Sequence, residues 1–586
     1  MKRLITFISA GLALISCNYL EPIKEPLYNY DNLKDYPSYV QGFIGNGYKM
    51  LPSNFISEEV MNIDILSDDL VQTSQSAAMH NFALGVSNPS NYPFEDIWNK
   101  YYQAINYANI FLQDELGRNM RYMLDSESNA KLVRRLWGEA YAIRAWYQYR
   151  LLRLFGGVGE DKKLYGYVIR TQASSYDNLQ TDVKRDSYEN CVKQIVADCD
   201  TASLYLPDAY RDDLLTDPEV DGSVGFQRFD RISALSIKAL TLLQWASPAF
   251  NPSNDKKRWE DAARAAYEVI KLKMEVDGRH FDPLAPFSWS DPNSAEIILR
   301  SKVVKNGDLE NSLYPQNCYG KCYLAPSQNL VDAFPMANGY PINDPRSGYS
   351  ANNPYQNRDP RLYEYIFYNG SKIITSSGSI YYEFNTAPGG MDEPERYEYN
   401  SRSGYYVKKY TYKDYYPYAT TVLTAARCVF LMRWTHILLA FAESANHAFG
   451  PADSSLGLSA KEALALVRSR SLPGGASGLG AVSDPYLDEC TNAGEAAFDA
   501  LVRNERRVET CFEGMRFFDL QRWSNGTELL NVDINKVKID IVGGKYEYSE
   551  QKLHTHNLPS QWLPLPRKEI IKCNSLVQNN GYELWK

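Results

Sequence analysis

A dense run of charged side chains, residues 503–523, has more potential for chemistry than any other stretch of this 586-residue chain. Arg506, Glu509 and Glu513 follow one another at steps of three and four, so on a helix they would lie close enough to pair. The aromatic residues among them would desolvate these ions, and a desolvated Arg needs a fixed carboxylate partner. The spacing therefore predicts a structural ion-pair network at a helix corner. A cluster of catalytic carboxylates is the alternative.

We expect the charged run to begin inside a helix. Asn492 followed by Glu495 has the spacing of an N-terminal capping box, and apolar residues recur at steps of three and four from Phe498 to Phe512. Gly514 offers the left-handed conformation that ends many helices. The charge pattern is then repeated by Arg516, Asp519 and Arg522.

The composition is that of a folded protein rich in aromatic side chains. The chain has 45 Tyr and 10 Trp, which either fill a large helical core or line a surface for flat, polar ligands. A net charge of -9 argues against a nucleic-acid partner, because phosphate binding needs a basic surface. The sequence has no G-x-S-x-G, no H-E-x-x-H and no phosphate or dinucleotide loop, so we expect neither catalysis nor a cofactor.

The first residues have the pattern of a secretory signal that ends in a lipid-attachment site. A short positive start precedes an apolar run from Leu4 to Ile15, which is too short to span a membrane. The run leads to Cys17 in a sequence that resembles a bacterial lipobox. No later stretch is apolar enough to span a bilayer, so we expect an anchored chain. The expected divisions are a signal peptide over 1–16, a lipidated tether over 17–40 and one domain over 41–586.

Apolar stripes at helical spacing recur along much of the remaining chain. One of them, over 132–154, has apolar residues on two sides, so this helix is expected to lie between two neighbours. Asp186 with Glu189 and Ser459 with Glu462 have the spacing of helix starts. The pattern predicts a mainly α fold of about four tetratricopeptide-like helix pairs, with an irregular helical domain as the alternative. The expected pairs are 98–112 with 132–154, 188–199 with 232–246, 259–270 with 431–445, and a helix after Ser459 with the charged run.

Helical periodicity disappears between about 276 and 424. Pro, Gly, Asn and Tyr dominate there, and an alternating run from Tyr405 to Tyr410 suggests a short strand. Residues 51–95 also read as loop. An excursion of this length, rich in loops and short strands, is usually functional, so we expect it to form the ligand face.

The charged run also carries a family resemblance. The pattern E-R-R-x-E-x-x-x-E-G-x-R-x-x-D-L-x-R-W over 505–523 resembles the carboxyl-terminal signature of the SusD/RagB family, the glycan-binding lipoproteins of the outer membrane. The segment 434–436 departs from the family by reading Trp-Thr-His. The resemblance implies tetratricopeptide-like helices with a loop-built ligand face, and a SusC-like TonB-dependent transporter as partner. Further stretches that resemble the family lie at 98–109, 139–158, 247–251, 358–361, 433–443 and 578–582.

Aromatic rings on loops are the side chains expected to bind a sugar. Sugars present apolar C–H faces and a rim of hydroxyls, so a site needs exposed rings beside Asp, Asn or Arg. Trp289 is the leading platform, and packing within the loops is the alternative for each candidate. The predicted ligand contacts, from the excursion and from the earlier loop region, are Trp289, Tyr314, Tyr319, Tyr323, Asp68, Asp69, His80 and Tyr92.

A metal site is not expected. Cys318 and Cys322 share one loop and could pair with each other, but no His lies near them in sequence to complete a zinc site. His554 and His556 offer only two ligands, so we expect them to be surface histidines, with a metal site as the alternative. The eight cysteines besides Cys17 permit disulfides without requiring them.

The leading hypothesis is a non-catalytic, surface-exposed outer-membrane lipoprotein that binds oligosaccharides and delivers them to the transporter. A second hypothesis keeps the scaffold and makes peptides or glycopeptides the ligand. A third is a cell-surface glycosidase, which would need only two suitably placed carboxylates.

Overall fold

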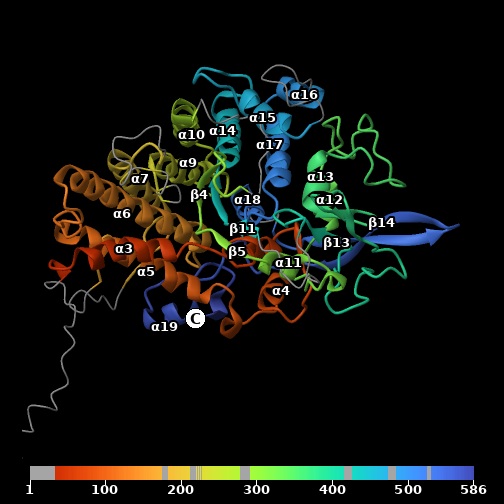
Figure 1. Ribbon diagram of the computed structural model, residues 1–586, viewed down its shortest axis with the longest axis horizontal. Helices are drawn as coiled ribbons and strands as arrows, with labels where there is room; N and C mark the ends of the chain where they lie inside the picture. Colours follow the sequence, from red (N-terminus) through yellow and green to blue (C-terminus); the bar gives the residue numbers. More distant parts are fainter. Residues whose placement is uncertain are drawn as a thin grey trace, which may run out of the picture.

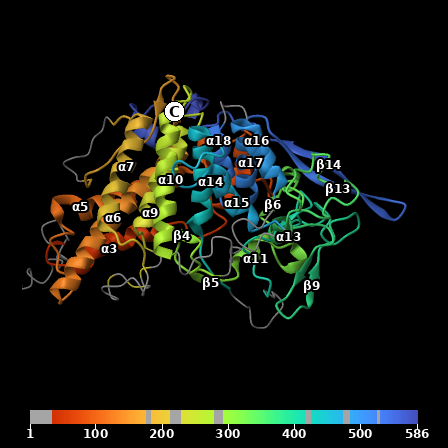
Figure 2. The ribbon, with the colours of Figure 1, turned by 90° about the horizontal axis from the view of Figure 1, so that it is seen from above.

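A stack of helices forms one side of the molecule (Figure 1). The computed structural model describes residues 33–174, 183–210, 220, 222, 225, 228–277, 291–414, 425–472, 484–523 and 529–585. Successive long helices pack against one another in chain order, as Figure 2 shows from above. The helices are α3 (Pro37–Lys49), α5 (Glu95–Leu112), α6 (Ser126–Phe155), α7 (Tyr188–Tyr205), α9 (Arg231–Ala246), α10 (Lys256–Asp277), α14 (Trp434–Phe449), α15 (Ala460–Ser469), α16 (Pro485–Ala493), α17 (Glu495–Glu509) and α18 (Arg516–Trp523).

The predicted mainly α fold and its tetratricopeptide-like pairing are confirmed. Helix α5 packs on α6, α7 on α9, and α10 on α14, although about 150 residues of sequence separate the last two. Helix α6 contacts both α5 and α7, which explains why it is buried on two sides. Arg144 of α6 donates two hydrogen bonds to the carboxylate of Asp198 in α7, at 2.6 and 2.8 Å, and so fixes the two helices against each other.

The fourth predicted pair is built around a shared neighbour. Both α15 and α17 pack against α14, and α16 lies between them in sequence and packs against α17. A buried ion pair between Arg468 and Glu505, at 3.0 Å, joins α15 to α17 directly.

Two predicted helix starts were wrong. The side chain that caps α7 is Ser187, because the carboxylate of Asp186 instead accepts a hydrogen bond from the Ile169 amide. Helix α17 begins after Gly494, and Asn492 belongs to the end of α16. The capping box of Ser459 with Glu462 is present as expected.

A narrow neck of paired strands joins the excursion to the helices. Strand β4 (Ile297–Arg300) follows α10 and pairs with β12 (Phe430–Arg433), which leads directly into α14. Next to this ladder, β5 (Val304–Asn306) pairs with β11 (Ala425–Arg427). The neck brings the two ends of the excursion together, and this is how α10 and α14 become neighbours.

Within the excursion the strands are short, as predicted, and form two-stranded ladders in the described residues. The predicted strand over 405–410 is only two residues long. The ladders are β7 (Ile366–Phe367) with β10 (Tyr406–Val407), β8 (Lys372–Ile374) with β9 (Ile380–Glu383), and β6 (Leu324–Pro326) with β1 (Leu70–Gln72). Short helices lie between them: α11 (Asp308–Leu313), α12 (Gln328–Ala333) and α13 (Pro360–Tyr365).

A long hairpin projects from the excursion side of the molecule (Figure 1). It consists of β13 (Asp533–Val542) and β14 (Lys545–Thr555), and α12 packs against β13 at its base. The remaining elements are α4 (Ala78–Ala83), α19 (Arg567–Lys572), and β2 (Gly157–Val158) paired with β3 (Leu164–Tyr165).

In the described residues the apolar core has two parts. The larger runs through the helix stack. The smaller, which we call the second hydrophobic cluster, lies within the excursion and consists of Tyr314, Cys318, Cys322, Ala325, Phe367, Ile373, Phe384 and Tyr406.

The cysteines of the described chain are all buried as free thiols. The local pair that the sequence left open, Cys318 with Cys322, is therefore not formed. Among the described residues no helix combines the length and the hydrophobicity needed to cross a bilayer.

Candidate functional site

The charged run forms a buried ion network centred on Arg433, at the start of α14. Its guanidinium donates hydrogen bonds to Glu513 at 2.8 and 2.9 Å and to Glu509 at 3.1 Å. Lys409 of the excursion adds a bond to Glu513 at 2.8 Å, and its ammonium also binds two backbone carbonyls. The charged run thus forms a structural network, as expected, but the network ties the excursion to the helices instead of only closing a helix corner.

The predicted pairing along the helix was wrong, because the ions find partners far away in sequence. Arg506 pairs with Asp519 at 2.6 Å rather than with Glu509 or Glu513. Helix α17 ends at Glu509, and the left-handed backbone of Phe512 and Gly514 turns the chain so that Glu513 lies off the helix.

The network carboxylates are held in the ionised state. Burial alone would raise the pKa of Glu513, but Arg433 and Lys409 hold it well below its usual range. Arg433 and Arg361 lower the pKa of Glu509 against burial in the same way. A general acid must carry a proton near neutral pH, so these two groups fit a structural role.

Four of the predicted ligand residues are engaged inside the protein. Asp68 pairs with Arg516 at 2.8 Å, and Asp69 pairs with Arg507 at 2.7 Å. His80 is buried beside His554. Tyr92 is buried among other rings, and its hydroxyl donates to the Pro564 carbonyl at 2.7 Å. Trp289 lies outside the described residues.

Two predicted tyrosines are exposed on one loop of the excursion. Tyr319 has 61% of its surface exposed and Tyr323 has 38%. Tyr314, at the start of the loop, is buried and belongs to the second hydrophobic cluster. Tyr319 has a left-handed backbone with φ of 58°, a conformation that non-glycine residues adopt mainly where surrounding contacts impose it. Gly320 is required next to it, because a Cβ there would lie 1.9 Å from the Tyr314 carbonyl oxygen.

The two loop regions that carry the predicted ligand contacts meet in space. Strand β1, directly after Asp69, pairs with β6, directly after Tyr323. The Thr73 amide donates to the Tyr323 carbonyl at 3.2 Å, which extends this ladder to the exposed tyrosine.

A neighbouring loop extends the surface around these tyrosines. Asn317 donates to the Met391 carbonyl at 2.9 Å, and the Tyr399 amide donates to Gln316 at 3.3 Å. Met391 is itself about half exposed. We call this surface the tyrosine face and define it by Tyr319, Tyr323, Met391, Gln316 and Asn317.

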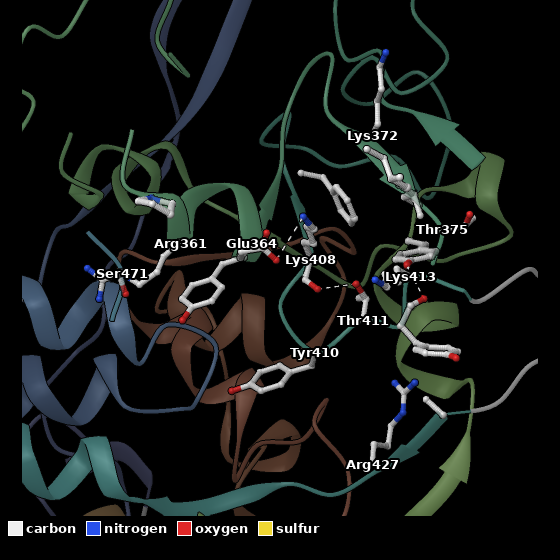
Figure 3. Close-up of a pocket in the computed structure, with 18 of the residues that line it drawn as sticks. Arg361, Glu364, Lys372, Thr375, Lys408, Tyr410, Thr411, Lys413, Arg427 and Ser471 are labelled. Atoms are coloured by element: carbon white, nitrogen blue, oxygen red, sulfur yellow. Dashed lines mark hydrogen bonds and ion pairs between the residues drawn. The ribbon is translucent and has the colours of Figure 1, made fainter. Parts of the chain in front are cut away.

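A cavity of about 800 Å³ opens between another part of the excursion and the ends of α15 and α17 (Figure 3). It is bounded by α13, β8, the segment after β10 and β11. The second hydrophobic cluster supports both surfaces, since Phe367 and Ile373 line the cavity while Cys318 and Cys322 flank Tyr319. Of the residues that line the cavity, only Tyr314 was predicted from the sequence to contact a ligand. The signal that this prediction missed is the lining set of basic residues: Arg361, Lys372, Lys408, Lys413, Arg427 and Arg470.

The described residues hold no group of three or more His, Cys, Asp or Glu side chains arranged to bind a metal ion. His554 and His556, expected on the surface, lie together at the end of β14 with ring centres 5.0 Å apart, and His556 is buried.

Two family models together match most of the chain. Residues 293–582 match the model described as the SusD family, and residues 31–226 match one described as starch-binding proteins associating with the outer membrane. A curated relative, SusD-like protein P2 of Formosa agariphila, is 23% identical over 99% of this chain and all of its own length.

Solved structures agree on the fold. A SusD-like protein from Bacteroides fragilis has a TM-score of 0.69 at 22% identity, over 93% of this chain and 96% of that one. Surface glycan-binding protein A from Bacteroides fluxus has a TM-score of 0.57 at 18% identity, over 93% of this chain and 99% of its own. With the signature at 505–523 and the matching family models, the chain belongs to the SusD/RagB family.

Proposed function

We propose that this protein is a non-catalytic lipoprotein of the outer membrane that binds oligosaccharides and delivers them to a SusC-like TonB-dependent transporter. The observation that carries the proposal is the tyrosine face, which offers exposed rings beside amide groups in a family whose model is described as starch-binding. The rings suit the apolar faces of sugars, and the amides of Gln316 and Asn317 suit their hydroxyls.

The tyrosine face is also held rigidly, which favours binding. The ladder of β1 with β6 and the close contact at Gly320 fix the loop, so little conformational entropy is lost when a ligand orders it. Trp289 remains a predicted third platform.

The test is retardation of the protein lacking residues 1–17 in native gels that contain one polysaccharide each. We expect at least one glycan to retard it, and Tyr319→Ala and Tyr323→Ala each to weaken binding by about tenfold. Tyr546→Ala is the matched control, because Tyr546 is a similarly exposed ring on the remote hairpin. Trp289→Ala, run alongside, tests the platform that the sequence predicts.

The same samples test the alternative functions. Retardation relieved by peptides, but not by free sugars, would replace the glycan with a peptide or glycopeptide ligand. New reducing ends after incubation with polysaccharide would refute the non-catalytic part of the proposal. Absence of retardation by every glycan would refute glycan binding by the isolated protein.

Anchoring and partnership form the second half of the proposal. Cys17→Ala should abolish incorporation of labelled fatty acid and release the protein from the membrane fraction, whereas Cys573→Ala should do neither. Purification of the lipidated protein from outer membranes should recover a TonB-dependent transporter with it. Membrane retention by the Cys17 variant would contradict the proposed anchor.

A further inference from the structure

The cavity in the excursion has a distinctly basic lining. Six basic side chains contribute to its walls, against the two carboxylates of Glu364 and Glu509. The chain as a whole carries a net charge of -9, so the lining departs from the average surface. A concave, basic surface concentrates anions in its neighbourhood.

Arg427 is a lining cation with unused hydrogen-bonding capacity. Only 7% of the surface of Arg427 is exposed, and one nitrogen of its guanidinium group donates a hydrogen bond to Glu310 at 2.9 Å. The other two nitrogens, Nε and Nη1, have no hydrogen-bond partner in the described part of the chain. Glu310 compensates the charge of Arg427 but leaves two donors, and buried donors are normally satisfied. In Figure 3 the guanidinium points toward the space beside Thr411 and Lys413.

Two lysines add positive charge to the same walls. Lys413 is exposed and takes part in no ion pair within the described residues. Lys408 donates to the Tyr363 carbonyl at 2.5 Å and has Glu364 4.0 Å away. Burial lowers the pKa of Lys408, Glu364 opposes this shift, and the neighbouring charge of Lys413 adds to it.

The cavity also has the apolar walls that a sugar ring needs. Tyr365, Phe367, Tyr410 and Tyr412 contribute rings to the lining, and Thr411 contributes a hydroxyl. Tyr410 has a left-handed backbone with φ of 72°, and its ring packs 4.8 Å from that of Phe55. Its position is therefore set by contacts with the main body of the protein.

We propose that this cavity is a second binding site, separate from the tyrosine face, for an anionic saccharide unit whose carboxylate or sulfate group is held by Arg427 and Lys413. An oxyanion supplies the acceptors that Arg427 Nε and Nη1 lack, and adjacent guanidinium donors match its geometry. The aromatic walls favour a sugar ring over a bare ion. The inference rests on the proposed function in one respect, that the ligand is a saccharide.

The test is calorimetric titration of the protein lacking residues 1–17 with three oligosaccharides of similar size. One is carboxylated, trigalacturonate; one is a sulfated galactan oligosaccharide; and one is neutral galactotriose. We expect at least one anionic oligosaccharide to bind about tenfold more tightly than the neutral one, with affinity falling as salt rises from about 50 to about 500 mM. The first two arms distinguish carboxylate from sulfate.

Variants place the site. Lys413→Gln should weaken anionic binding by about tenfold, and because this side chain is exposed, the variant should fold normally. Arg427→Gln is made together with Glu310→Gln, so that no buried charge is left unpaired, and should abolish anionic binding. The matched control is Lys538→Gln, an exposed lysine on the hairpin.

The outcomes separate this inference from the proposed function. The inference is overturned if no anionic oligosaccharide binds, or if the cavity variants leave anionic binding unchanged. Binding of the neutral oligosaccharide that depends on Tyr323 would still support the proposed function. Displacement of the anionic sugar by an acidic peptide of equal affinity would overturn the saccharide assignment. If no saccharide of any charge binds at either surface, both the inference and the proposed function are refuted.

Discussion

Acidification should destabilise this protein through a cluster of three histidines. His80 of α4 lies 5.1 Å from His554 of β14, between ring centres, and His554 lies 5.0 Å from His556. In the described chain, both ring nitrogens of His554 and of His556 have no hydrogen-bond partner. Burial and the neighbouring histidines lower the pKa of His556 to about 3. Burial, His80 and Arg402 lower that of His554 to about 4.

The sign follows from which state binds more protons. An unfolded histidine has a pKa near 6.5. Between about pH 6.5 and pH 4 these histidines therefore bind protons in the unfolded chain but stay neutral in the folded protein. Stability is therefore complete above pH 6.5 or so and is lost as the pH falls toward the folded values. At pH 5 the loss is about 2 kcal/mol for His556. His554 is partly exposed, and solvent screening reduces its share to about 1 kcal/mol.

The assay is urea unfolding near pH 7 and near pH 5, compared between the wild type and the double variant His554→Leu/His556→Leu. Carboxylates and His80 titrate in both proteins, so the difference isolates His554 and His556. Arg402 and Asp68 also face these two histidines. The wild type should lose about 3 kcal/mol more than the variant.

His447 provides a control of opposite sign. Burial alone would lower its pKa, but Asp499 and Glu495 raise it, so its contribution is present at low pH and is lost as the pH rises. His447→Gln should therefore increase the loss on acidification. Equal losses in the wild type and the His554→Leu/His556→Leu variant would refute the reasoning.

Three further predictions concern the scaffold. Arg433→Leu leaves Glu509 and Glu513 without their main partner and should reduce the free energy of unfolding by about 3–5 kcal/mol in urea titrations; a loss below about 1 kcal/mol would show that water replaces the guanidinium. Gly514→Ala should destabilise by more than about 2 kcal/mol, because φ is +68° and the new Cβ would lie 2.3 Å from the Val60 carbonyl oxygen; Gly450→Ala, with a positive φ but open space around it, should lose less. The eight cysteines should not react with a thiol reagent in the folded protein lacking residues 1–17, because all are buried, and should all react in urea; rapid reaction without urea would contradict their burial.

The helix stack could be predicted because its signal is periodic and local. The stripes over 259–270 and 431–445 predicted that α10 and α14 pair, although the excursion separates them. Helix starts were less reliable: Asp186 and Ser187 are both good capping residues, and tertiary contacts decided between them.

The candidate site could be predicted only as a region. Tyr92, Tyr314 and Tyr319 all lie in sequence that reads as loop, yet two are buried and one is exposed. Whether a ring is exposed depends on which other segments of the chain pack over it, and a single sequence does not give these tertiary contacts. The ion pairs were missed for a related reason, since spacing favours partners on the same helix, whereas Glu513 finds Arg433, 80 residues away.

The neck and the ion network together explain how loops can present a defined binding surface. Arg427, the donor assigned to the anion, belongs to β11, which is clamped to β5 beside the ladder that leads into α14. Arg361, on another wall of the cavity, is fixed by Glu505 and Glu509 of α17. Opposite walls of the cavity are thus attached separately to the helix stack. Because binding affinity depends on how little must be ordered when the ligand arrives, we infer that the charged run supports the proposed site by fixing the wall that carries Arg361.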